Sequence, residues 1–171
     1  MVCRRNGGRC CRSCDIDRRS GDRVKVSFFV PGIPVPQGSM TGRVQGKRAV
    51  IYASNEKKLR PWREAVTRMA RASWLDRTQL EGPVRLDAVF VFARPATVKR
   101  RLPSVFPDLD KLVRAVGDGV TEAGIWKDDG QVIRIVAEKV YGAAPGVHVS
   151  VSEMSADVPT RGERLLAGMG K

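Results

Sequence analysis

The stretch from Val84 to Phe92 most constrains how this chain can fold. It lies between Pro83 and Arg94, and its second half is almost continuously apolar. A strand with apolar residues on both faces needs cover on both faces, whereas a half-exposed strand alternates apolar with polar residues. We therefore expect this stretch to be a central strand of a β-sheet.

Further strands and two helices are predicted around it. Alternating or β-branched runs predict strands at Val24 to Val30, Arg48 to Ala53, Gln131 to Tyr141 and Val147 to Met154. Apolar residues at helical spacing predict helices from about Arg60 to Trp74 and from Leu109 to Thr121. The first helix is expected to begin near Arg60 because proline, here Pro61, is tolerated in a first turn. The pattern indicates the α+β class.

The chain length limits the number of domains. With 171 residues, of which 42% are hydrophobic, the chain can bury one core but hardly two. The first strand and the last strand place the globular domain at residues 23–154. We expect a basic, Cys- and Arg-rich extension at residues 1–22 and a C-terminal tail at residues 155–171.

All four cysteines lie in the N-terminal extension, at Cys3, Cys10, Cys11 and Cys14. The spacing of Cys11 and Cys14 is that of a zinc knuckle, but all four ligands would have to come from one crowded peptide. The alternative, which we favour, is a disordered basic extension, since Gly, Arg and Ser dominate it. A core without thiols fits the reducing cytoplasm, which would be that of the host cell if a phage encodes the chain.

The net charge indicates the partner. A formal charge of +13 favours a polyanionic partner, because basic residues that bind phosphates release counterions. Nucleic acid is the leading interpretation, ahead of an anionic membrane surface. No apolar run approaches the roughly twenty residues of a membrane span, so we expect no membrane partner. Lys99, Arg100 and Arg101 stand directly before an acidic motif, where they either bind phosphate or are simply solvated.

Acidic residues are concentrated within this basic chain. Six of the eighteen lie between Asp108 and Asp129. Part of this cluster has a structural explanation: Asp108 can cap the following helix, Asp110 suits the positive end of its dipole, and Arg114 can pair with acids one turn away on either side. The buried stripe of that helix is predicted to consist of Leu112, Val113, Val116 and Val120.

We expect that capping does not explain the pair Asp128 and Asp129, because two like charges lead straight into an apolar strand. Oxygen ligands are what Mg²⁺ prefers, and one or two carboxylates with waters and a substrate phosphate complete its coordination. If Asp129 folds beside Asp108, carboxylates from two elements would converge on one ion. Such an ion could activate water and stabilise a leaving oxygen at a phosphodiester.

The run PDLDKLVRAVGDGVTEAGIWKDDGQV, Pro107 to Val132, resembles the signature of RusA-family Holliday junction resolvases. It begins with the motif D-x-D, has an interior acid at Asp118, continues with G-x-W and ends with D-D-x-Q-V. A looser similarity extends over about Arg23 to Met154. The resemblance implies a RusA-like single domain, in which a small mixed β-sheet packs against two main helices.

The resemblance also implies roles for individual residues. Asp108, Asp110 and Asp129 would be the essential acids that hold Mg²⁺, for which Mn²⁺ can substitute, and Asp128 would support them. Arg114 stands where the family can use a lysine, which implies a phosphate-clamping or charge-stabilising role. The implied activity is that of a homodimer that nicks two opposed strands of a four-way junction or other branched DNA, in recombination and repair.

The expected mechanism is metal-assisted hydrolysis, in which water attacks the phosphorus in line and Arg114 offsets developing negative charge. A non-catalytic DNA-binding recombination accessory protein is the alternative. The acidic residues argue against it, because a binding module gains nothing from an anionic patch that faces phosphate. A third hypothesis is a zinc-dependent regulator built on the N-terminal cysteines.

Overall fold

The computed structural model describes residues 23–38, 40–45, 48–53, 55–74, 78–155 and 159–169. The expected N-terminal extension, with its four cysteines and the zinc hypothesis, lies outside these residues. Contacts divide the chain into two compact units: one is Arg23–Met154, and the other comprises the two ends of the chain.

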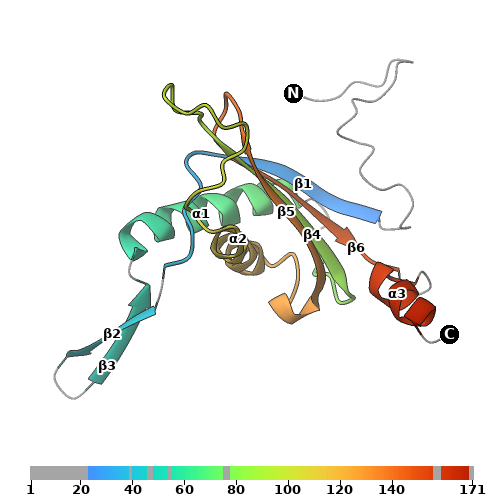
Figure 1. Cartoon of the computed structure of the whole chain (residues 1–171). Coiled ribbons are helices and arrows are strands. Elements are labelled where there is room, and N and C mark those ends of the chain that lie inside the picture. The colour runs from blue at the N-terminus through green and yellow to red at the C-terminus, as the bar shows by residue number, and fades with distance from the viewer. Residues whose placement is uncertain are drawn as a thin grey trace. The chain divides into compact units, whose positions relative to one another are not determined.

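The first unit is built on a four-stranded sheet with the order β1-β6-β4-β5 (Figure 1). Its strands are β1 (Arg23–Pro31), β4 (Val84–Phe92), β5 (Val132–Tyr141) and β6 (Gly146–Glu153). β6 pairs antiparallel with β1 and with β4, whereas β4 and β5 are parallel, so the sheet is mixed. β4 lies between two partners, which confirms the central strand predicted from its apolar sequence.

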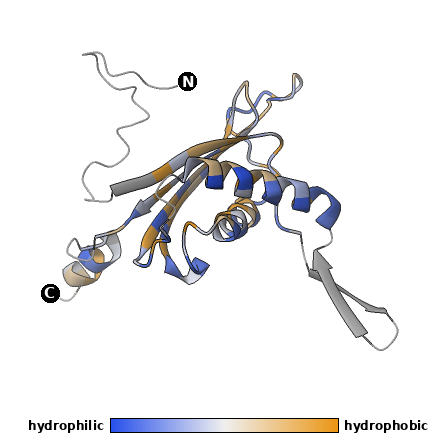
Figure 2. Ribbon diagram, turned by 180° about the vertical axis from the view of Figure 1, so that it is seen from behind, coloured by the Kyte–Doolittle hydropathy of each residue, from blue (hydrophilic) through white to orange (hydrophobic). Residues whose placement is uncertain are grey.

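Two helices cover one face of this sheet (Figures 1 and 2). They are α1 (Glu56–Ser73) and α2 (Leu109–Ala123), and they pack on each other. The predicted stripe of α2 is confirmed, since Leu112, Val116 and Val120 are buried and Val113 packs against the core. Burial of such side chains contributes about 1.5–3 kcal/mol each. The fold is therefore the predicted α+β domain.

The start of α1 differs from the prediction. The helix begins at Glu56 because the Asn55 carbonyl accepts the N–H groups of Lys58 and Leu59, at 2.9 and 3.0 Å. Pro61 therefore lies beyond the first turn. It is exposed, so the carbonyl that loses its helical partner can bond to water instead.

The structure also contains a short hairpin and a short C-terminal helix. β2 (Met40–Gln45) and β3 (Arg48–Ala53) form an antiparallel hairpin, as expected for the second of these strands. In the other unit, α3 (Arg161–Met169) occupies part of the expected C-terminal tail, where no helix was predicted. Its start carries a reciprocal cap in which Thr160 and Glu163 exchange backbone-to-side-chain hydrogen bonds. None of the helices in the described ranges has the length and apolarity needed to cross a membrane.

Candidate active site

The first two predicted site residues lie at the beginning of α2. Asp108 occupies the N-cap position and Asp110 lies in the first turn, and both are exposed. The Asp108 side chain makes no capping bond to the backbone, contrary to expectation. Its Oδ2 lies 2.9 Å from Lys111 Nζ, and this hydrogen bond raises the pKa of Lys111 above its ordinary value.

The loop after β1 supports this end of α2. The backbone N–H of Gln37 donates to the carbonyl of Lys111 at 2.9 Å, and the Asn55 side chain donates to the carbonyl of Pro36 at 2.7 Å. The start of α2 is thereby attached to the same loop as the start of α1. This loop is thus part of the support for Asp108 and Asp110.

The second acidic pair lies in a 3-10 turn, η2 (Asp129–Gln131), directly before β5. Asp128 is the N-cap of this turn, and its Oδ1 accepts the N–H of Gly130 at 2.7 Å. Gln131 Oε1 in return accepts the N–H groups of Lys127 and Asp128, at 2.8 and 3.2 Å. The expectation that capping does not explain this pair is therefore wrong for Asp128, which has a clear structural role.

Gln131 also fixes the turn to the rest of the domain. Its Nε2 donates to the carbonyls of Leu80 and Gly82, at 2.8 and 3.0 Å. Leu80 itself donates to the carbonyl of Ile125 at 2.8 Å. The sequence motif contained Gln131, but its role as the organiser of the turn was missed. The signal was present as the capping-box spacing from Asp128 to Gln131.

Asp118, in the middle of α2, interacts electrostatically with Asp129 of the second acidic pair. It is half-buried, and burial raises the pKa of its carboxyl group. Arg63 and Arg114 oppose this shift, whereas the negative charges of Asp129 and Glu122 add to it. Asp129 therefore lies within electrostatic range of the middle of α2. The sequence interpretation had treated Asp118 as part of helix pairing, and the link to Asp129 arises only from the fold.

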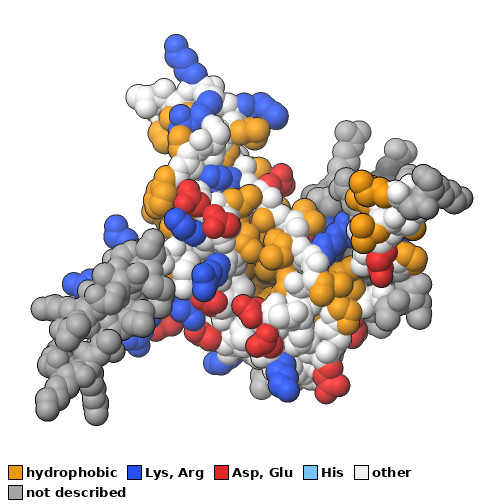
Figure 3. All heavy atoms as spheres, turned by 60° about the horizontal axis from the view of Figure 1, so that its bottom comes forward, with side chains coloured by type: hydrophobic (Ala, Val, Ile, Leu, Met, Phe, Trp, Pro, Cys, Tyr) orange, Lys and Arg blue, Asp and Glu red, His pale blue; other side chains and the backbone are white. Residues whose placement is uncertain are grey.

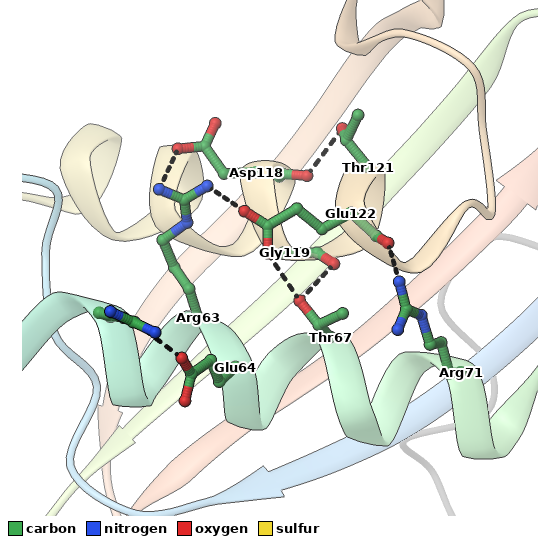
Figure 4. Close-up of polar contacts among 10 residues, drawn as sticks. Arg63, Glu64, Thr67, Arg71, Asp118, Gly119, Thr121 and Glu122 are labelled. Carbon is green, nitrogen blue, oxygen red and sulfur yellow. Dashed lines mark hydrogen bonds and ion pairs between the residues drawn. The ribbon is translucent and has the colours of Figure 1, made fainter.

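A polar network holds this part of α2 against α1 (Figure 4). Arg63 Nη1 lies 3.8 Å from Asp118 Oδ2, and the same guanidinium pairs with Glu122. Thr67 donates to the Gly119 carbonyl at 3.0 Å, and Arg71 donates to the Glu122 carbonyl at 2.6 Å. These contacts fix the face of α2 that carries Asp118.

The remaining predicted residues are open to solvent. Asp110, Arg114 and Asp129 are exposed, and the side chains of Asp110 and Asp129 make no hydrogen bond or ion pair with the other described residues. The available donors are carboxylate oxygens, the chemistry that Mg²⁺ and Mn²⁺ prefer. As they stand, no three acidic, His or Cys side chains of the described residues are close enough together to hold a metal ion.

Carboxylates on one helix and one turn of an α+β domain, in a chain of charge +13, are features of a nuclease that hydrolyses phosphodiesters. Residues 31–152 match the profile of the family described as Endodeoxyribonuclease RusA. The match spans more than half of the chain, so the chain belongs to the RusA family. This confirms the resemblance found in the sequence.

A relative is found among bacterial proteins. The uncharacterised protein YqaN of Bacillus subtilis (strain 168) is 27% identical to this chain over 143 residues. The similarity covers 77% of this chain and 98% of YqaN. RusA-family proteins are endodeoxyribonucleases that act on DNA junctions, so the family assigns this chain to the endodeoxyribonucleases.

Proposed function

We propose that the chain is a Mg²⁺-dependent, structure-selective endonuclease that resolves four-way junctions and other branched DNA in recombination and repair. It would act as a homodimer that makes paired, symmetric nicks. The observation that carries this proposal is the set of exposed carboxylates on α2 and η2, in a family of junction-cleaving nucleases. The strongly basic remainder of the chain suits a substrate with phosphates on several arms.

Asp108, Asp110 and Asp129 are the proposed metal ligands. Because like charges repel, these carboxylates would converge only around a cation that offsets their charge. The ion, when bound, supplies Lewis-acid activation of water and of the scissile phosphate. Asp128 supports the set by capping the turn that carries Asp129, and Gln131 keeps that turn in place.

Arg114 is the proposed cation of the chain itself. It lies on α2 between Asp110 and Asp118 and interacts electrostatically with Asp118. A guanidinium there would contact a phosphate oxygen and offset the charge that develops as the water attacks in line. Its role is to orient the phosphate and to stabilise negative charge.

The proposal is tested with a synthetic four-way junction and a linear duplex of matched sequence, each incubated with Mg²⁺ or with EDTA. Paired nicks on the junction alone, only with Mg²⁺, are expected, and Asp110→Asn and Asp129→Asn should abolish them. Glu64→Gln is the matched control, because Glu64 is an exposed carboxylate on α1 that pairs with Arg60 and lies outside the proposed site. Tight junction binding without cleavage in Mg²⁺ or Mn²⁺ would refute the proposal and support the alternative, a non-catalytic accessory protein.

A further inference from the structure

The loop from Ala93 to Pro107, between β4 and α2, combines two kinds of exposed side chain. It carries Lys99, Arg100 and Arg101, all exposed. It also carries three large apolar side chains with high exposure: Leu102 at 50%, Val105 at 48% and Phe106 at 74%. Single exposed apolar residues are ordinary, but a group of them beside basic residues indicates a binding surface. In Figure 3 this end of the domain shows Lys and Arg side chains beside hydrophobic ones.

The basic part of the loop is held in shape by Arg94. Its Nε donates to the carbonyl of Val98 at 3.0 Å, and its Nη2 donates to the carbonyl of Lys99 at 2.6 Å. The guanidinium also lies 6.0 Å from the centre of the Tyr141 ring, within the range of a cation–π contact. The exposed cations therefore project from a loop that is attached to β5.

Lys139 of β5 holds the other end of the loop. Its Nζ donates to the carbonyls of Val105 and Pro107, both at 2.8 Å. These two residues flank Phe106, so the backbone on either side of Phe106 is fixed to the sheet while its ring stays exposed. Asp108 follows two residues later. An aromatic ring is thereby presented on a fixed support beside the proposed active site.

An exposed ring beside cations matches the chemistry of unstacked nucleobases. Base–aromatic stacking contributes about 1–3 kcal/mol per base. In a linear duplex, an apolar wedge must first unstack a base step, which costs a few kcal/mol. At the branch point of an open four-way junction, the form without Mg²⁺, the stack is already interrupted, so the ring gains the contact without that cost. Such a ring favours branched DNA over linear DNA.

We propose that Phe106 recognises the branch point by stacking on an unstacked base, while Lys99, Arg100 and Arg101 contact the phosphates of the adjoining arm. This deepens the proposed function and rests on it, since it assumes a branched DNA substrate. Phe106 is a specificity-determining residue in this proposal, distinct from the acids that hydrolyse the phosphodiester.

Binding in EDTA tests the proposal without any cleavage. The full-length protein is titrated with a four-way junction carrying 2-aminopurine at the branch point, and with a linear duplex carrying it at the same step. Phe106→Ala should weaken junction binding roughly 5- to 150-fold, which is the stacking energy expressed as a ratio. Duplex binding should stay unchanged, and Phe106→Trp should retain the preference. Ile133→Ala, which truncates an exposed apolar residue of β5, is the matched control.

Several results would overturn the proposal. These are an equal loss of junction and duplex binding in Phe106→Ala, unchanged binding of both, or a 2-aminopurine signal that does not depend on Phe106. Sedimentation of the free protein is measured in parallel, because a change of oligomeric state in Phe106→Ala would mean that a second copy covers the ring. Selective, Phe106-dependent binding without cleavage in Mg²⁺ would refute the proposed function and leave branch recognition standing.

Discussion

The guanidinium of Arg63 lies 3.8 Å from the carboxylate of Asp118, yet the pKa of Asp118 is raised above its ordinary value. Burial between α1 and α2 outweighs the attraction of Arg63 and Arg114, and the charge of Asp129 adds to the shift. The folded chain therefore favours the protonated form of Asp118 more than the unfolded chain does. The charged form is tolerated at neutral pH at a cost in stability.

A pH-dependent stability difference follows for Asp118→Asn. Because the folded-state pKa is raised, Asp118 contributes more stability below its ordinary value of 3.8 than above the raised value. Asn cannot ionise, so the melting temperature of the variant should rise relative to wild type as the pH increases through that window. Thermal melts at a series of pH values from acidic to neutral check this. A difference that stays constant with pH would contradict it.

Two glycines of α2 should respond in opposite directions to the same substitution. A Cβ at Gly119 would lie 2.8 Å from Val66 Cγ1 and 3.3 Å from the Arg63 carbonyl, so Gly119→Ala should destabilise the fold by about 1–3 kcal/mol. At Gly117 nothing lies within 4 Å of the added Cβ, so Gly117→Ala should stabilise it by about 0.5–1 kcal/mol. Urea unfolding of both variants measures the difference. Equal effects would show that α1 and α2 do not approach closely at Gly119.

Removal of the Gln131 side chain should loosen the turn that carries Asp129. Gln131→Ala loses the bonds to Leu80, Gly82, Lys127 and Asp128, so it should cost about 1–3 kcal/mol in unfolding free energy. Junction cleavage should fall about 10- to 100-fold, as is typical when residues that orient metal ligands are lost.

Gln79→Ala is the control for this turn, because within the described residues the Gln79 side chain makes one hydrogen bond, to the Trp126 carbonyl at 3.1 Å. It should affect cleavage much less. If both variants cleave equally well at matched folded fractions, Gln131 serves the fold and not the site.

Lys139→Met should release the loop that precedes Asp108. The variant keeps the apolar stem of the side chain but loses both bonds to the carbonyls of Val105 and Pro107. Hydrogen exchange at residues 104–108 should become faster, and the preference for junction over duplex should fall. Lys127→Met removes an equal charge from an exposed position and should leave both unchanged. Identical exchange in the two variants would be evidence that Lys139 does not hold the loop.

The parts of the fold that could be predicted depend on local pattern. The apolar run of β4 and the apolar stripe of α2 can be read from neighbouring residues in the sequence. Both patterns predict burial whichever element packs against them. The start of α1 at Glu56 was not predicted. Proline was expected only in a first turn, but Pro61 is exposed, and there it is tolerated further inside the helix.

The site divides in a similar way. Its acidic residues could be identified from their spacing and from the family signature. Their arrangement could not, because it depends on contacts between distant residues: Gln131 reaches Leu80 across 51 residues, and Arg63 reaches Glu122 across 59. The electrostatic link from Asp118 to Asp129 likewise exists only when η2 lies against α2.

The parallel pairing of β4 and β5 has a consequence for how such chains can vary in length. Between these strands the backbone must return from one end of the sheet to the other, and every proposed ligand lies along that return path. One extra turn in α2 would displace the two acidic pairs by about 5.4 Å relative to each other. Insertions and deletions in α2 should therefore be incompatible with activity.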